Sequence, residues 1–284
     1  MAGLRREPTA RQIRLGVELR KMRNAAGLSG RESAAALGVT SSQITQIESA
    51  LSGVSEKRLR RMAAIYGCPD AELIDALVAM ATDRSRGWWE ADRGQLATPF
   101  LDLAELEHHA SYRWDADFIH VPGLLQTEAY AHALFSYINP EFPENEIERW
   151  VEHRMKRRTI IERPEPIPYK ALVHEAALRI RVGDRASALR QLSFTLEIAE
   201  ASHITLRVIP FDLDHFAGAG SAMLYVGSHV SKLDTIVRDA PHGVVYLDAE
   251  TQLSRCRTLF HRLEDAALAP RESRDFIHKL TKEL

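Results

Sequence analysis

The first 66 residues carry apolar side chains at helical spacing. Leu15, Leu19, Met22 and Ala26 recur at intervals of four, three and four residues, which predicts one apolar helix face. Gly27 can end that helix, because glycine readily adopts the left-handed conformation of a C-cap. The chain is therefore expected to begin its folded part with an amphipathic helix.

A second, short helix follows a start signal of its own. Ser29 and Glu32 form an S-x-x-E capping box, in which each side chain can bond a free backbone N–H of the first turn. This helix is expected to run through Leu37 and to end at Gly38, whose missing side chain permits a tight turn. Val39 then faces inward.

The third helix has a polar outer face. Thr40 can cap a helix over residues 41–49, in which Ile44 and Ile47 point to the core. The side chains expected to point outward are small and polar: Ser41, Ser42, Gln43, Thr45 and Gln46. A fourth helix is predicted over Lys57–Tyr66.

The rest of the chain alternates between strand-like and helix-like segments. Strands are expected within residues 112–122, 169–174, 203–211, 221–226, 234–239 and 243–247. Helices are expected over residues 101–112, 127–135, 141–163, 184–201 and 249–267. The predicted fold class is a mainly α N-terminal domain followed by an α+β C-terminal domain with a mixed sheet covered by helices.

Charge is divided unevenly between these two parts. Residues 1–66 hold 12 Lys/Arg and 5 Asp/Glu, a net charge of +7, whereas residues 67–284 carry a net charge of -9. A small basic module on an acidic body indicates that the module meets a polyanion. The alternative is chance clustering of cations on a solvated helix face.

The cysteines and the hydropathy pattern limit the remaining classes. Cys68 and Cys256 lie far apart without CxxC spacing, so the sequence offers neither a disulfide scaffold nor a cysteine zinc site. It has no run of 18 apolar residues and no apolar segment after the first charges, so neither a membrane span nor a secretory signal is expected. We therefore expect a cytoplasmic protein with no membrane contact.

The basic module meets the requirements of helix-turn-helix DNA recognition. Two helices are joined by a glycine-containing turn, and the second presents short amide and hydroxyl side chains that can read base edges in a major groove. The predicted base contacts are Ser41, Ser42, Gln43, Thr45 and Gln46, and the predicted phosphate contacts are Thr40, Arg31, Lys57 and Arg58. The alternative is a plain helical bundle with one polar face.

Residues 15–67 resemble the Xre-type (Cro/repressor-like) helix-turn-helix family over essentially the whole module. In that family the helix that begins near Thr40 reads DNA, and an arginine of the first helix pairs with a glutamate of the third; Arg23 and Glu48 match these positions. The resemblance thus implies a structural ion pair. Three positions depart from the family pattern: Ser33 replaces a buried leucine, Ala50 a glycine and Gln46 an arginine.

The C-terminal part carries a second resemblance. The strings VPGLLQTEAYAHAL, HEAALRIRVG, ITLRVIPF and GVVYLDAE are similar to the uncharacterised C-terminal domain of actinobacterial Xre-type regulators, from about Trp89 to Leu284. Relatives in that group are antitoxin-like or developmental regulators, often encoded beside a small partner protein. The resemblance implies such a partner without implying a ligand.

Several residues are candidates for an effector or partner surface. Trp88 and Trp89 lie in a linker-like stretch, where simple packing is favoured over lining a pocket. Trp114 and His215 are further candidates for a small-molecule cavity. His174 and Glu175 lie at the end of a predicted strand. They are candidates for polar residues of a pocket or a partner surface, and the alternative is a hydrogen-bonded interior role.

The sequence gives little support for catalysis. HEAAL at residues 174–178 imitates the zinc-protease pattern H-E-x-x-H, but Leu178 stands where the second ligand is required. No nucleophile elbow, phosphate loop or dinucleotide motif follows a predicted strand. We therefore expect no enzyme activity, no metal and no cofactor.

A basic run at Arg154 and residues 156–158 is expected to be a solvated helix face in preference to a second nucleic-acid patch.

These predictions combine into a domain plan with two functional hypotheses. The plan comprises a flexible tail (1–12), the helix-turn-helix domain (13–82), a linker (83–100) and a regulatory and dimerisation domain (101–284). The first hypothesis is a transcriptional regulator that binds double-stranded DNA at an inverted repeat as a homodimer, and whose C-terminal domain binds a small partner protein or effector. The alternative is an antitoxin-like interaction module that sequesters a small neighbour-encoded protein and uses DNA binding for autoregulation.

Overall fold

A computed structural model describes residues 7–214, 216–218, 220–240 and 243–284. The chain divides into two units. The first comprises the residues up to Arg93 together with Leu101–Leu106, and the second comprises Gly94–Phe100 and Glu107–Leu284. The helix α6 (Thr98–His108) is therefore shared between the two units.

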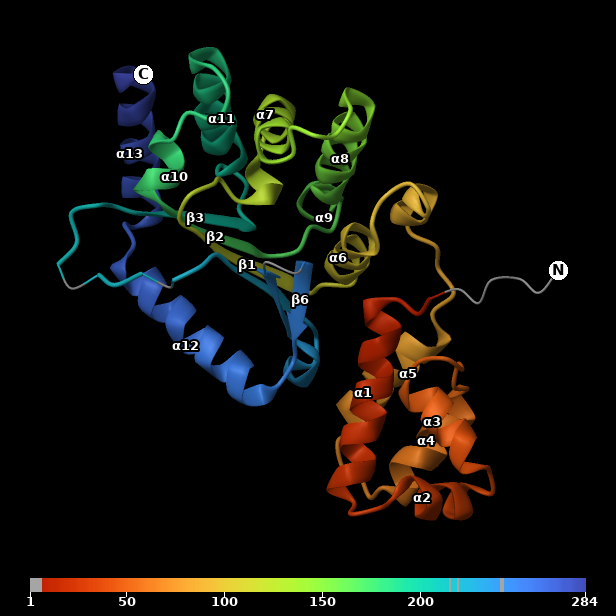
Figure 1. Ribbon diagram of the computed structural model, residues 1–284. Helices are drawn as coiled ribbons and strands as arrows, with labels where there is room; N and C mark the ends of the chain where they lie inside the picture. The colour runs from red at the N-terminus through yellow and green to blue at the C-terminus, as the bar shows by residue number, and fades with distance from the viewer. Residues whose placement is uncertain (1–6, 215, 219, 241–242) are drawn as a thin grey trace. The chain divides into compact units, whose positions relative to one another are not determined.

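The first unit is helical (Figure 1). Its helices are α1 (Ala10–Ala25), α2 (Gly30–Leu37), α3 (Ser41–Glu48), α4 (Glu56–Ile65) and α5 (Ala71–Thr82), followed by the 3-10 helix η1 (Trp88–Asp92). Leu19, Leu59, Met62 and Leu77 are completely buried, so α1, α4 and α5 share one core. The unit is thus the helical module that the hydrophobic spacing predicts.

The start of α1 differs from the sequence-based expectation. The helix begins at Ala10, inside the stretch 1–12 for which the sequence predicts a flexible tail, because Thr9 and Gln12 form a capping box there. Ala26 is exposed as the C-cap of this helix, so its assignment to the inner face is wrong. The predicted linker at 83–100 likewise contains η1 and the first turn of α6.

The second unit contains a six-stranded mixed sheet among its described residues. The strands are β1 (Tyr112–Asp117), β2 (Tyr169–His174), β3 (Ile204–Ile209), β4 (Met223–Gly227), β5 (Thr235–Ala240) and β6 (Gly243–Leu247). Their spatial order is β3-β2-β1-β4-β5-β6. β1, β2 and β3 pair in parallel, whereas β4, β5 and β6 add antiparallel strands. The predicted mixed sheet and the predicted fold class are confirmed.

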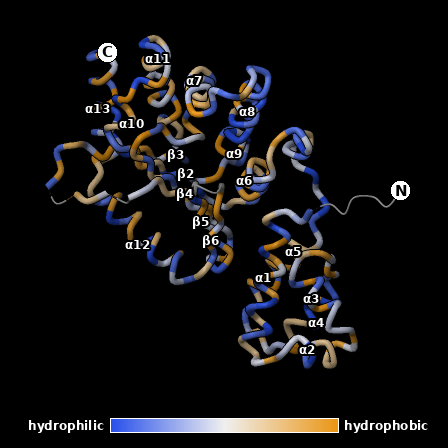
Figure 2. Tube along the Cα trace, viewed as in Figure 1, coloured by the Kyte–Doolittle hydropathy of each residue, from blue (hydrophilic) through white to orange (hydrophobic). Residues whose placement is uncertain are grey.

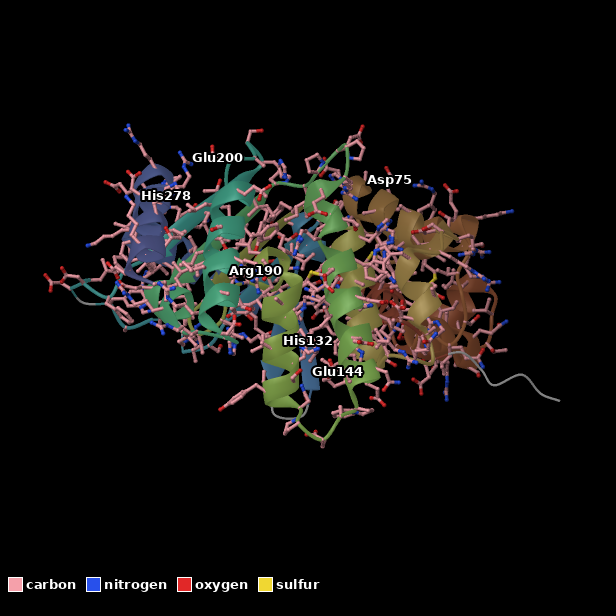
Figure 3. The ribbon with its side chains drawn as sticks, turned by 90° about the horizontal axis from the view of Figure 1, so that it is seen from above. Asp75, His132, Glu144, Arg190, Glu200 and His278 are labelled. Atoms are coloured by element: carbon pink, nitrogen blue, oxygen red, sulfur yellow. The ribbon has the colours of Figure 1, made fainter. Side chains whose placement is uncertain are left out.

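Helices cover both faces of this sheet (Figure 1). The helices of the unit are α7 (Glu128–Ile138), α8 (Glu144–Arg157), α9 (Thr159–Glu162), α10 (Glu175–Arg179), α11 (Arg185–Ile198), α12 (Glu250–Ala266) and α13 (Pro270–Glu283), with short 3-10 turns η2 (Gly123–Leu125) and η3 (Ser231–Leu233). The long helices mix hydrophobic and hydrophilic residues along their length (Figure 2). α7 packs beside α8, and a 2.6 Å hydrogen bond joins His132, in the middle of α7, to Glu144 at the start of α8 (Figure 3).

One face of the sheet packs against α12. Leu253, Cys256 and Phe260 of α12 are buried against strand residues such as Ala116 and Met223. Trp114 stacks between Tyr225 and Phe260, with ring-centroid distances of 5.1 and 4.9 Å. Trp114 is therefore a packing residue of this core.

Successive side chains of a strand point to opposite faces of the sheet. The face of β1 opposite to Trp114 carries buried charged side chains. Arg113 donates two hydrogen bonds of 2.9 Å to Asp115 and forms an ion pair with Glu107. Arg157 donates two hydrogen bonds of 2.7 Å to the same Glu107, and Tyr169 donates one of 2.7 Å to Asp115. All five residues are at most 5% exposed, so the second unit contains a buried ionic network.

This network corrects the expectation for the basic run on α8. Arg157 is 5% exposed, and Arg154 and Arg158 are half-buried; only Lys156 is exposed. Arg154 donates to the Gln126 side chain at 2.6 Å. The prediction of a solvated helix face is wrong, because periodicity places these cations on the helix but does not reveal the buried acceptors that they meet, such as Glu107 and Gln126.

Candidate DNA-binding surface

The turn between α2 and α3 is built by the local signals seen in the sequence. Ser29 and Glu32 form the predicted capping box at the start of α2. Gly38 has a φ of 69°, the left-handed conformation that lets α2 stop and the chain turn. Thr40 then caps α3 in a capping box with Gln43. The predicted helix starts are confirmed.

The core-facing side of α3 is almost fully buried. Ile44 is 1% exposed and Ile47 is 4% exposed, so both point inward as predicted. On the other side, Ser41, Ser42, Gln43 and Thr45 are exposed and Gln46 is half-buried. The helix therefore presents a polar face to solvent.

Two of the five predicted base-contacting side chains are already engaged in the fold. The Gln43 side-chain oxygen accepts a 3.0 Å hydrogen bond from the Thr40 amide, and the Thr45 hydroxyl donates a 3.1 Å bond to the Ser41 carbonyl. No side-chain hydrogen bond is formed by Ser41, Ser42 or Gln46 with the described residues. These three side chains are the ones free to read base edges without a prior bond being broken.

The predicted phosphate-contacting residues include three exposed cations. Arg31 on α2 and Lys57 and Arg58 on α4 are exposed and make no ion pair with the described part of the chain. Thr40 is exposed, but its hydroxyl accepts the capping bond from the Gln43 amide. The neighbouring Arg60 is instead bound to Glu56 and Asp75 at 2.9 and 2.8 Å. Arg31, Lys57 and Arg58 therefore remain available to a polyanion.

α3 is held in place by a largely buried ion pair, whose Arg23 and Glu48 side chains are 13% and 5% exposed. The Arg23 guanidinium donates to Glu48 at 2.6 and 2.9 Å and also to the Leu28 carbonyl at 2.8 Å. The bond to Glu48 raises the pKa of Arg23, so the guanidinium stays charged. Arg20 of the same helix donates to Glu48 at 3.3 Å. The resemblance identifies Arg23, while the contribution of Arg20 is visible only in the structure.

A close backbone contact completes this attachment. A Cβ atom added at Gly16 would lie 2.5 Å from the Glu48 carbonyl oxygen, so the glycine lets α1 approach the last turn of α3. Sequence reasoning missed Gly16, because a glycine inside a helix pattern signals a close approach without naming the partner.

Two of the departures from the family pattern have structural consequences. Ser33 is completely buried and is hydrogen-bonded at 2.6 Å to the Tyr66 hydroxyl, so a polar pair occupies the site of the usual leucine. Ala50, which follows the third helix, has a φ of 57° and is the one non-glycine residue with positive φ in the described chain. The alanine thus adopts the left-handed conformation for which the family pattern has a glycine, at a cost of about 1 kcal/mol.

The candidate effector residues are distributed over both units. Trp88 and Trp89 lie in η1 of the first unit with their rings 6.0 Å apart, and Trp89 is 3% exposed. Trp114 lies in the core of the second unit. The prediction at His215 lies outside the described residues.

His174 and Glu175 occupy the end of β2. The His174 ring nitrogen Nδ1 accepts a 3.2 Å bond from the Ala176 amide and so caps α10. Burial lowers the pKa of His174, whose ring stacks at 5.8 Å on Phe216. Glu175 accepts from the Phe211 amide at 2.9 Å and pairs with Arg179. Both side chains therefore have structural partners.

Two kinds of feature are absent from the residues that the structure describes. No group of three or more histidine, cysteine or carboxylate side chains is placed to hold a metal ion within residues 7–214 and the later described stretches. Among those same residues, no helix has the length and apolar character needed to cross a membrane.

A helical unit that presents a polar, capped third helix beside exposed cations defines a helix-turn-helix protein, a DNA-binding class. Residues 14–77 match the family described as a helix-turn-helix domain. Residues 100–279 match the family described as a domain of unknown function, DUF5753, and the chain belongs to that family. No curated protein and no solved structure matches the chain.

Proposed function

We propose that the protein is a sequence-specific transcriptional regulator that reads operator DNA with α3. One observation carries this proposal: α3 presents Ser41, Ser42 and Gln46 outward with no side-chain bond to the described part of the chain, while Ile44 and Ile47 anchor its inner side. Exposed Arg31, Lys57 and Arg58 supply the cations that phosphate contacts need. The chain acts in this proposal without catalysis, in the cytoplasm.

The regulator binds as a homodimer on an inverted repeat, joined chiefly through the C-terminal domain. A single recognition helix contacts too few base pairs to select a genomic site, and a two-fold dimer doubles the readout. The acidic character of residues 67–284 supports this division of labour, because negative charge is unfavourable against DNA.

The base-reading and phosphate-binding assignments are tested by comparing two variants with a matched control. Gln46→Ala should relax specificity at one operator position and cost about 1–3 kcal/mol there. Lys57→Ala should weaken binding to every sequence alike and reduce the salt slope by about one unit. Arg181→Ala removes an exposed cation of the second unit and should change neither property. Uniform loss in both α3 and α4 variants would contradict the assignment of α3.

A second candidate function is the antitoxin-like interaction module of the actinobacterial group that the sequence resembles. It is favoured by exposed apolar side chains at the end of α7 and just after it: Tyr137, Ile138 and Phe142 are 86%, 56% and 39% exposed. Contiguous exposed apolar surface is typical of protein-interaction sites. Size-exclusion chromatography of the full chain with the small neighbour-encoded protein tests this candidate, and Tyr137→Asp should abolish a complex that forms there.

A further inference from the structure

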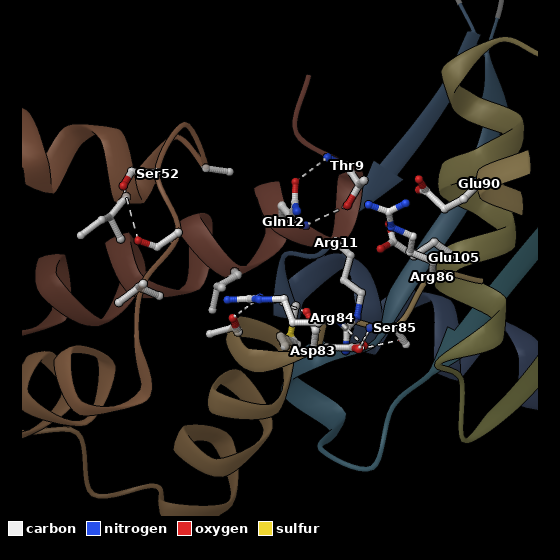
Figure 4. A pocket seen from close by; sticks show the side chains of 17 residues that line it. Thr9, Arg11, Gln12, Ser52, Asp83, Arg84, Ser85, Arg86, Glu90 and Glu105 are labelled. Carbon is white, nitrogen blue, oxygen red and sulfur yellow. Dashed lines mark hydrogen bonds and ion pairs between the residues drawn. The ribbon is translucent and has the colours of Figure 1, made fainter. Parts of the chain in front are cut away.

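The first unit contains a cavity that none of the DNA-binding residues uses. Its volume is about 450 Å³, within the range of small-molecule sites (Figure 4). The lining comes from the start of α1, the last turn of α3, the loop before α4, the end of α5 with the segment after it, and α6. Apolar side chains, including Leu15, Val54 and Met80, contribute to the wall.

The charges around the cavity are balanced. The ionisable groups of the lining are three arginines and three carboxylates: Arg11, Arg84, Arg86, Asp83, Glu90 and Glu105. A ligand with a net charge would leave this part-buried lining unbalanced, which is unfavourable away from water. A ligand that carries one charge of each sign avoids that cost.

Glu105 is the group that requires a donor from the cavity. Its Oε2 atom is buried and has no hydrogen-bond partner in the described chain. Burial raises the pKa of this carboxyl, and the neighbouring Asp102 and Glu90 raise it further. A hydrogen bond with Thr9 and the charge of Arg11 oppose these effects, but neither satisfies Oε2, and the Arg11 guanidinium also pairs with Asp83 at 3.4 Å. An ammonium group would supply the missing donor.

Arg86 is the group that can receive an anion. It is exposed and forms no ion pair with the described residues. The neighbouring Arg84 instead donates at 3.0 Å to the carbonyls of Ala81 and Asp83. A carboxylate can therefore bind the Arg86 guanidinium without displacing an existing partner.

We propose that this cavity binds a small zwitterion with an apolar body, of the α-amino-acid type, with its ammonium group at Glu105 and its carboxylate at Arg86. We further infer that occupancy changes the affinity for DNA, a consequence that rests on the proposed function. The lining includes Ile47, in the last turn of α3, and Ala50, whose positive φ lies directly after that helix. A ligand in the cavity thus touches the end of the helix that reads DNA.

Binding is tested by calorimetric titration of the full chain with L-leucine, L-methionine and L-phenylalanine. Isoamylamine and 4-methylpentanoate, which each lack one charge of leucine, serve as matched ligands. At least one amino acid should bind, and each single-charge ligand should bind about tenfold more weakly or worse. Absence of binding by all three amino acids, or equal binding of the single-charge ligands, would overturn the proposal.

Three variants locate the site. Glu105→Gln and Arg86→Gln should each weaken amino-acid binding about tenfold or more, while Arg181→Gln should leave it unchanged. Arg86 is exposed, so this variant keeps the test valid if Glu105→Gln unfolds. Unchanged binding in Arg86→Gln would contradict the proposed orientation.

DNA affinity measured with and without the bound amino acid separates the two proposals. Ligand binding with at least a threefold change in DNA affinity supports the inference. DNA binding that does not respond to a bound ligand refutes the regulatory part of it alone. Ligand binding in a protein that binds no DNA refutes the proposed function and leaves the cavity assignment standing.

Discussion

Single residues determine how closely α1 approaches α3. Gly16→Ala would place a methyl group 2.5 Å from the Glu48 carbonyl oxygen and 2.8 Å from its carbonyl carbon. Backbone atoms cannot move aside as a flexible side chain can, so the variant should lose about 1–3 kcal/mol of unfolding free energy. Chemical denaturation of the full chain, followed by the helical signal, measures this loss.

Gly30→Ala is the matched control for that variant. A Cβ atom at Gly30 meets nothing within 4 Å, and the residue lies in the first turn of α2. Alanine is the better helix former, so stability should stay the same or rise. Equal destabilisation by both substitutions would show that the close contact at Gly16 is not what matters.

The sequence predicts residue roles best where the partner is near in the chain. The capping boxes at Ser29 and Thr40 span three residues, and the structure contains both. Ser33 was recognisable as a departure from a buried leucine, but its bond to Tyr66, 33 residues away, was not. Only packing brings those two hydroxyl groups together.

His174 should make stability depend on pH. Burial lowers its pKa, so in the unfolded chain the ring takes up a proton at higher pH than in the folded chain. Its contribution is therefore present above the unfolded value, near 6.5, and is lost as the pH falls toward the folded value. His174→Asn keeps a capping acceptor for α10 and removes the titration.

Denaturation of both proteins at pH 7 and pH 5 checks this expectation. The wild-type protein should lose more unfolding free energy than His174→Asn over that interval. An identical loss in the two proteins would assign the pH dependence to other groups.

At the scale of elements, the position of α3 depends on Glu48. Glu48 is 5% exposed and accepts from Arg23 and Arg20, so Glu48→Ala leaves a largely buried guanidinium without its carboxylate. The expected loss is roughly 3 kcal/mol of unfolding free energy. If α3 is the recognition helix as proposed, DNA affinity should fall with it, because α3 loses its ionic attachment to α1.

Glu56→Ala provides the comparison on α4. Glu56 pairs with Arg60 in a solvent-exposed geometry, with side chains 53% and 47% exposed. Exposed ion pairs contribute little, so thermal denaturation should show almost no change. A similar loss in both variants would mean that burial does not distinguish the two pairs.

Several element boundaries followed from helical periodicity, with a side-chain cap in α3 and α11 and without one in α12. α3 ends within one residue of its expected end, and α11 and α12 lie inside their predicted ranges. α13 was not predicted, although Pro270 at its first turn is a start signal. The large apolar residues that α13 buries are Ile277 and Leu280, and two such residues are too few to predict a helix from the sequence. In the structure, α13 packs on the strand β3.

At the scale of the whole chain, the second unit depends on its buried charges. Arg157→Ala removes two 2.7 Å hydrogen bonds from Glu107, which is 1% exposed. An incompletely paired buried carboxylate should cost about 3 kcal/mol, and unfolding of the second unit should move to lower temperature. Arg181→Ala, at an exposed position, should change stability by no more than about 0.5 kcal/mol.

The sheet order illustrates what lies beyond sequence reasoning. All six strands were expected, and β4 and β5 each run one residue beyond the expected end, but neither the parallel pairing of β1, β2 and β3 nor the place of β4 beside β1 followed from the pattern. Pairing depends on which helices cover each edge, as α13 does for β3 through the 2.9 Å bond between Val208 and Ser273. The cavity of the first unit also had no signal in the sequence, because its lining residues come from segments that are far apart in the chain.

The central claim is sequence-specific DNA binding by the full chain. The most direct measurement is a fluorescence-anisotropy titration with the DNA upstream of the protein's own reading frame, against a scrambled duplex of equal length, at two salt concentrations. We expect tighter binding to the upstream DNA at both salt concentrations, and loss of that preference in Ser42→Ala/Gln46→Ala. Equal binding of the two duplexes at both salt concentrations would contradict it.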